Sequence, residues 1–112
     1  MAFRILLGGL LFAVVAYTVP VLLNHGPNLF PVFFGDIAEG TWRGQFNVDF
    51  MGFLVLSAVW VAWRHGFKPL GLLLAAPAFL GGIPFLTTYL LIVSFQANGN
   101  MKVIMLGSSR AV

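Results

Sequence analysis

Three long apolar stretches alternate with short polar segments along the chain, over residues 4–23, 46–63 and 70–95. A helix that crosses the hydrocarbon core of a bilayer needs about 20 apolar residues. Each stretch is close to that length, and together with their connections they use up nearly the whole chain. The pattern therefore predicts an all-α membrane protein, with three transmembrane helices in a single domain over residues 1–112.

The segment between the first two stretches predicts a further, shorter helix over residues 28–39. Asn28 is a residue type that caps helix starts. The apolar side chains that follow are accompanied by Asp36 and Glu39, which is typical of a helix lying in the membrane interface. We therefore expect a short interfacial helix here, followed by a turn in which Trp42 acts as an interfacial anchor.

Composition supports the membrane prediction and excludes several classes of function. Hydrophobic residues make up 60% of the chain and charged residues only 8%, whereas a soluble domain carries about 25% charged residues. The six basic residues form no run, which excludes a nucleic-acid-binding protein. The chain has no cysteine, so it has no disulfide, thiolate metal site or cysteine nucleophile.

The first apolar stretch fits two interpretations. A short basic start at Arg4 and the sequence Ala16-Tyr17-Thr18 loosely resemble a secretory signal peptide. The apolar run is long enough to span a bilayer, however, and this favours a retained transmembrane helix.

Small residues recur at helical spacing in the first and third stretches, where they would give each helix a smooth face. Such faces let helices approach closely in lipid. The predicted packing residues are Gly9, Ala13 and Ala16 in the first helix, and Gly71, Ala75, Ala78 and Gly82 in the third. We expect the bulky second helix to pack between or against these faces, and the third helix to be kinked near its prolines.

Asp49 is the strongest polar candidate, because an ionisable group inside a membrane segment is costly and often functional. A second helix that begins after Gln45 places Asp49 about 6 Å along its axis. Asp49 could anchor the preceding loop by hydrogen bonding to its backbone or by pairing with Arg43. It could instead bind a substrate or a proton, or contact a partner. The shallow depth favours the anchor.

The two histidines and two tryptophans are weak candidates for contacts with a ligand. His25 and His65 lie at helix ends, and neither has a second histidine or an acid at metal-ligand spacing. Trp60 and Trp63 share one helix face with Asp49, where a pigment ring or a neighbouring helix could lie. We predict no metal site and no catalytic residue.

The basic residues near the helix ends are divided equally between the two predicted sides of the membrane. Three predicted crossings place Arg4, Arg64 and Lys68 on one side and Arg43, Lys102 and Arg110 on the other. The short loop that carries Arg64 and Lys68 favours that side as cytoplasmic. We expect the N-terminus inside and the C-terminus outside.

Several short motifs together resemble a family of small bacterial membrane proteins. They are His25-Gly26, Asn28-Leu29, Phe46 with Asp49, Arg64, Gly81 with Pro84, and Tyr89-Leu90. In order and spacing, over roughly residues 5–92, they resemble the three-helix family known as domain of unknown function 2834. The resemblance implies three spans and a place for Asp49 in the family pattern, but it implies no activity.

The tail over residues 96–112 is too short to span and departs from that family, and it suggests a docking segment. We therefore expect a non-catalytic accessory subunit of a larger complex in the bacterial inner membrane, either energy-converting or photosynthetic. Membrane lipids and other transmembrane subunits would be its partners, and lipid, carotenoid or chlorophyll-type pigment its possible ligands. The alternative is a small homo-oligomeric carrier or channel with Asp49 at its mouth.

Overall fold

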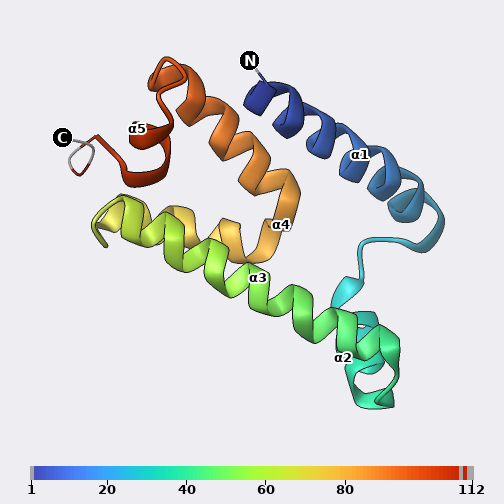
Figure 1. The fold of residues 1–112 in the computed structure, drawn as a ribbon. Coiled ribbons are helices and arrows are strands. Elements are labelled where there is room, and N and C mark those ends of the chain that lie inside the picture. Colours follow the sequence, from blue (N-terminus) through green and yellow to red (C-terminus); the bar gives the residue numbers. More distant parts are fainter. Residues whose placement is uncertain (1, 109, 111–112) are drawn as a thin grey trace.

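A computed structural model describes residues 2–108 and 110, and these residues form helices joined by short turns (Figure 1). The helices are α1 (Ala2–His25), α2 (Leu29–Glu39), α3 (Trp42–Arg64), α4 (Pro69–Gln96) and α5 (Met101–Leu106). By length and composition, α1, α3 and α4 could each cross a membrane. The predicted all-α fold with three helices of spanning length is therefore confirmed.

Helix α2 coincides with the short helix predicted between the first two long ones. It ends at Gly40, whose left-handed backbone (φ 68°) lets its N–H bond to the carbonyl of Ile37. Thr41 is extended, and α3 begins at Trp42, four residues before the predicted start of the second span. That α2 lies in a membrane interface stays a prediction.

Helix α4 is broken in the middle at Gly82. This glycine has φ 59° and ψ −140°, a conformation outside the helical region. Two residues later Pro84 has no N–H to donate to the preceding turn, which weakens the helix further. The break divides α4 into two arms, residues 69–81 and 83–96, which diverge in Figure 1 as a yellow arm and an orange arm.

The two arms of α4 form a V whose ends both lie at the C-terminal end of α3. At the apex, a Cβ atom added to Gly82 would lie 3.1 Å from Phe50, in the first half of α3. The first arm starts beside the end of α3, where a Cβ on Gly71 would lie 3.2 Å from the carbonyl of Ala62. The second arm returns to the same end, where Tyr89 and Trp60 are in edge-to-face contact. The predicted kink is therefore a reversal of the chain.

The core lies between the arms of the V, where α3, α4 and α5 meet. Its fully buried residues include Val61 of α3, Ala78 of α4 and Ile104 of α5. Leu7 of α1 joins the same cluster. The central element is therefore α4, which contacts α1, α3 and α5. Of the two arrangements predicted for the bulky second helix, between the other two or against them, α3 packs against α4.

Helix α1 packs on the second arm of α4 only through its N-terminal half. Leu7 is buried there, whereas residues 15–25 are all exposed. The predicted packing residues Gly9, Ala13 and Ala16 are exposed as well, and a Cβ on Gly9 would meet nothing within 4 Å. The small-residue face of α1 is therefore uncovered within the described part of the chain.

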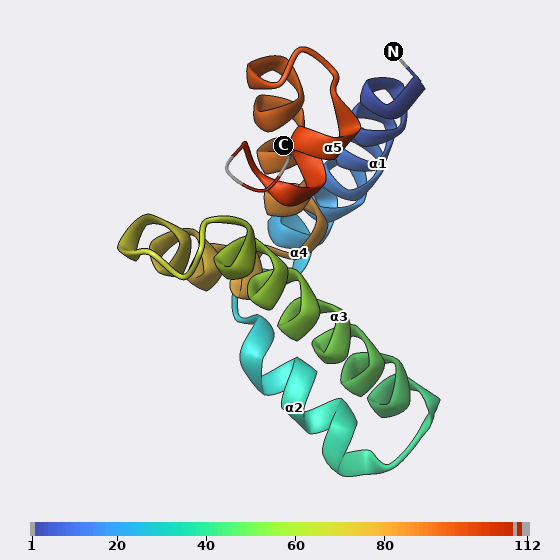
Figure 2. The same cartoon turned by 60° about the vertical axis from the view of Figure 1, so that its left-hand side comes forward.

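Helix α2 folds back along the first half of α3, and Figure 2 shows this pair projecting away from α1 and α5. The two helices approach closely at the buried Gly44. A Cβ atom there would lie 2.8 Å from the Cα of Ile37 and would overlap the carbonyl of Asp36. Only glycine allows this contact between α2 and α3.

Candidate functional site

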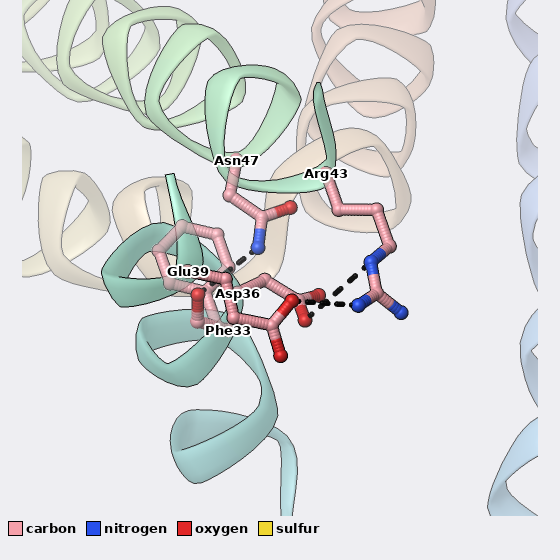
Figure 3. A network of polar contacts seen from close by, with 5 residues as sticks. All are labelled: Phe33, Asp36, Glu39, Arg43 and Asn47. Carbon is pink, nitrogen blue, oxygen red and sulfur yellow. Dashed lines mark hydrogen bonds and ion pairs between the residues drawn. The ribbon is translucent and has the colours of Figure 1, made fainter. Parts of the chain in front are cut away.

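Polar side chains gather at the two ends of α3, and we call the cluster near its start the acidic end. Here Arg43 is flanked by Asp36, with Nε 3.9 Å from Oδ1, and by Glu39, with Nη2 2.7 Å from Oε2 (Figure 3). One turn further along α3, the Asn47 side-chain amide donates to the carbonyl of Phe33 at 3.0 Å. These contacts fasten α2 to α3.

Asp49 takes no part in that fastening, which differs from the predicted anchor. It is exposed, and its carboxylate has no hydrogen bond or ion pair within the described residues. Because residues two apart point to different helix faces, Asn47 faces α2 while Asp49 faces away from it. Because α3 begins at Trp42, Asp49 also lies about 10 Å along the axis, deeper than expected.

At the other end of α3, the Arg64 side chain holds α5 in place. Its guanidinium donates from Nε to the carbonyl of Ile104 at 2.7 Å and from Nη2 to that of Val103 at 3.2 Å. The last carbonyls of any helix have no partner within the helix. Arg64 supplies a partner for Ile104 and a second one for Val103, whose carbonyl also accepts from the backbone N–H of Gly107. Its positive charge suits the helix C-terminus.

Tyr89 connects Arg64 to the neighbouring histidine. Its hydroxyl accepts a hydrogen bond from Arg64 Nη1 at 3.1 Å and lies 2.7 Å from Nε2 of His65. Trp60 packs its ring edge-to-face against Tyr89, with 6.0 Å between centroids, and donates its indole N–H to the carbonyl of Met105. The buried Tyr89 therefore ties the second arm of α4 to α3.

The surroundings of His65 favour its neutral form. Burial lowers the pKa of His65 below its ordinary value, and the positive charge of Arg64 lowers it further. The ring therefore faces Tyr89 as a neutral partner at neutral pH.

Two further arginines at this end are satisfied without any acid. Arg4 donates from Nε to the hydroxyl of Ser94 at 2.8 Å, and its guanidinium lies 4.2 Å from the centre of the Phe95 ring. Arg110 donates to the carbonyl of Trp63 and lies 4.2 Å from the centre of that ring. Cation–π contacts of this kind replace ion pairs.

We call this cluster the basic end: Arg4, Arg64, His65, Lys68, Lys102 and Arg110. The three acidic residues of the sequence, Asp36, Glu39 and Asp49, all lie in α2 or the first half of α3. Among the described side chains the charges are therefore separated along the molecule, with both signs at one end and only positive charge at the other.

A polar cavity of about 460 Å³ opens at the basic end, between the two ends of α4 and the end of α5. Its charged or titratable lining residues are Arg64, His65 and Lys68. The remaining lining residues are Gly66, Val93, Gln96, Ala97, Val103, Gly107 and Ser108.

The tail over residues 96–112, expected to dock on a partner, is folded onto its own chain as far as it is described. Its helix α5 buries Ile104 completely, and Arg64 and Trp60 both donate to its carbonyls. The V of α4 leaves room for α5 between its arms. Docking of the tail on a partner stays a prediction.

The other predicted site residues are scattered. Trp60 and Trp63 hold the tail in place instead of leaving a bare face. His25 is exposed at the end of α1, whereas His65 follows the end of α3, and these two helix ends lie on opposite sides of the view in Figure 1. In the third helix, Gly71 and Ala78 are buried, Ala75 is half-buried, and Gly82 forms the break. Within the described residues, no three His, Asp or Glu side chains gather as a metal site would need.

Sequence reasoning missed Asn47, Ser94 and Tyr89 as contact residues. Asn47 and Asp49 are equally polar positions near the start of α3, and only their orientation separates them. Ser94 and Tyr89 are polar groups in an apolar helix, a signal that invites a search for buried hydrogen bonds. Their partners lie 90 and 25 residues away in sequence, at Arg4 and Arg64, so spacing alone could not identify them.

Comparisons with protein-family models, with curated proteins and with solved structures found no match to this chain. The resemblance to the three-helix family of unknown function therefore stays a prediction.

Proposed function

We propose that this protein is a non-catalytic accessory subunit of a larger membrane assembly, with other transmembrane subunits as its partners. The observation that carries the proposal is the exposed Asp49 carboxylate on a helix of spanning length. Charged groups within a membrane face a protein interior or water, because contact with lipid tails is costly. A neighbouring helix with a cation or a hydrogen-bond donor at this depth would cover Asp49.

The exposed face of α1 supports the same proposal. Gly9, Ala13 and Ala16 lie along it at helical spacing, and α4 leaves them uncovered. Close packing over small residues is a common mode of helix association in lipid. A face of this kind, together with Asp49 on α3, would give the subunit two contact surfaces for other helices.

The proposed orientation follows from the charge separation. Lys and Arg accumulate on the cytoplasmic side of a membrane. We place the basic end of the molecule at the cytoplasmic face of a bacterial inner membrane. In this arrangement α1 and α3 cross the bilayer, whereas α4 enters and returns. Residues near the N-terminus and in the tail then lie on the same side, instead of on opposite sides as the sequence predicted.

A small homo-oligomeric carrier or channel is the second candidate, and the broken α4 favours it. Interrupted helices line the substrate sites of many transporters. An apolar cavity of about 260 Å³ lies beside Gly82, and the buried hydroxyl of Ser57 in its lining has no hydrogen-bond partner among the described residues. In this interpretation Asp49 would stand at the mouth of a path between copies of the chain.

Mild-detergent purification followed by native mass spectrometry separates the two proposals. We expect other membrane proteins to co-purify in fixed ratio, and Asp49→Leu to release them. Glu39→Gln is the control, because it also removes an acid but lies on α2. Copies of this chain alone would overturn the subunit proposal. The carrier then predicts flux in reconstituted vesicles that Asp49→Asn abolishes. Absorption spectra of the purified complex would reveal a carotenoid or chlorophyll-type pigment.

A further inference from the structure

The cavity at the basic end has an excess of positive charge that a bound anion would neutralise. Arg64 and Lys68 line it, and no acidic side chain does. The three acids of the sequence lie in α2 and the first half of α3, towards the opposite end of the molecule. Among the described residues, no carboxylate in the cavity wall therefore pairs with these two positive charges, although Arg64 also faces the carbonyls near the end of α5.

The lining also presents hydrogen-bond donors suited to an oxyanion. Arg64 uses three of its five N–H donors on Tyr89, Val103 and Ile104, and two remain. The Lys68 side chain is exposed, and an ammonium group carries three donors. Gln96 and Ser108 add neutral donors from the end of α4 and from the segment after α5.

The position of the cavity suits a ligand at the membrane surface. It lies where α3 ends and where both arms of the V in α4 have their outer ends, so it opens at the ends of helices of spanning length. Basic pockets between transmembrane helices on the cytoplasmic side bind the headgroups of acidic lipids. A volume of about 460 Å³ can contain a phosphate group with its neighbouring glycerol.

We infer that this cavity binds a phosphate oxyanion, held by Arg64 and Lys68, as carried by the headgroup of an acidic phospholipid. The phosphate would lie between the first arm of α4 and the tail. It would link Lys68 to the segment that follows α5. The site does not depend on partner subunits, because its lining comes from this chain alone.

The test uses the full chain in dodecyl maltoside micelles with its histidines labelled with ¹³C. The sequence has two histidines, so the spectrum reports His65 in the cavity and His25 as an internal reference. A bound anion favours the protonated imidazole and shifts the His65 signal. Arg64, Lys68 and Tyr89 are the charged or titratable groups around it. The titrants are dihexanoyl phosphatidylglycerol, dihexanoyl phosphatidylcholine and inorganic phosphate.

We expect phosphatidylglycerol to shift His65 saturably and His25 not at all, with phosphatidylcholine at least tenfold weaker. Saturation by inorganic phosphate at equal affinity would also support the oxyanion site, and would identify the free anion as its source. Equal responses to the two lipids, or no saturable response to phosphatidylglycerol or phosphate, would overturn the inference.

A pair of variants tests the residues. Lys68→Gln should weaken phosphatidylglycerol binding about fivefold, the loss expected for one basic side chain near an anionic surface. Lys102→Gln removes the same charge from the same end but from a side chain outside the cavity lining, and should change the affinity less than twofold. Equal losses in the two variants would indicate general charge attraction and overturn the site. Both residues are exposed on the surface of the protein.

Discussion

The two ends of α3 hold their polar side chains in different ways. At the acidic end, Arg43 pairs with Asp36 and Glu39 on the surface, with its own side chain 69% exposed. At the basic end, the half-buried Arg64 has no acid beside it, and its donors go to two carbonyls and a phenol. Surface ion pairs contribute little to stability, whereas partly buried hydrogen bonds from a charged group contribute more. The ion pairs at the acidic end are easier to recognise, but they contribute less to stability than the hydrogen bonds of Arg64 at the basic end.

The strongest test of this comparison is Arg64→Met. The variant keeps the apolar stem but leaves the carbonyl of Ile104 without its donor and that of Val103 with the backbone N–H of Gly107 alone. We expect the free energy of unfolding to fall by about 3 kcal/mol, the scale of hydrogen bonds to a charged group. Titration with sodium dodecyl sulfate in mixed micelles measures it. Limited trypsin digestion should also cleave faster after Lys102, because α5 loses its attachment. Unchanged digestion would show that Arg64 does not hold α5.

At the acidic end, the close approach of α2 and α3 should contribute more to the free energy of unfolding than the ion pairs do. Gly44→Ala places a methyl group against the backbone of Asp36 and Ile37, so we expect a loss of about 1–3 kcal/mol from overpacking. Gly52→Ala is the matched control on the same helix, because nothing lies within 4 Å of its added Cβ. There the gain in helix propensity should stabilise the protein slightly. Equal effects at the two positions would contradict the packing of α2 on α3.

A smaller effect should follow from pH at the basic end. Because the folded protein lowers the pKa of His65, the unfolded chain binds a proton more readily. Stability is then fully present above about pH 6.5, the ordinary histidine value. It falls as the pH drops through that value towards the lower pKa of the folded state. Unfolding titrations at pH 7.5 and at pH 5.5 measure this loss.

Two histidine variants locate the pH effect. His65→Gln should remove it, whereas His25→Gln, at the far end of α1, should retain it. A pH dependence that survives His65→Gln would assign the effect to another group. It would also show that the positive charges of Arg64 and Lys68 do not change stability through the protonation of His65.

The smallest effect is expected from Arg43→Gln. Both of its ion pairs lie on the surface, where solvent and salt weaken them. We expect an unfolding midpoint indistinguishable from that of the unchanged protein, at low and at high salt. Asn47→Ala, which leaves the carbonyl of Phe33 without its donor, should cost more. A larger loss for Arg43→Gln than for Asn47→Ala would reverse the ranking of these two contacts.

The long helices could be predicted from the sequence because apolar length is a local property. The sequence places the start of the second helix too late because residues 43–45 are not apolar, although residues 42–45 are helical. That error made Asp49 look like an interfacial anchor. Whether a polar residue faces α2 or the outside depends on the rotation of α3 about its axis relative to α2. That rotation distinguishes Asn47 from Asp49, and the pattern of a single helix does not contain it.

The V of α4 could be predicted only as a kink. Gly81-Gly82 and Pro84 indicate a weak point, but the direction of the bend follows from the φ and ψ angles that Gly82 adopts against Phe50. The position of the tail follows from that direction, since α5 fits only between arms that diverge. The basic end and its cavity therefore required the fold, because they unite residues that three straight crossings would place on opposite sides.

The hydrogen bond between Arg4 and Ser94 also has a consequence for the synthesis and membrane insertion of the protein. Its partners are 90 residues apart, nearly the length of the chain. A ribosome adds about 5–20 residues per second, so Ser94 follows Arg4 after roughly 5–20 s. During that time α1 has no contact with the second arm of α4. Its stability must then come from lipid or from the insertion machinery. The contact that joins the first helix to the rest thus forms late in synthesis, followed only by the contacts of the tail among those described.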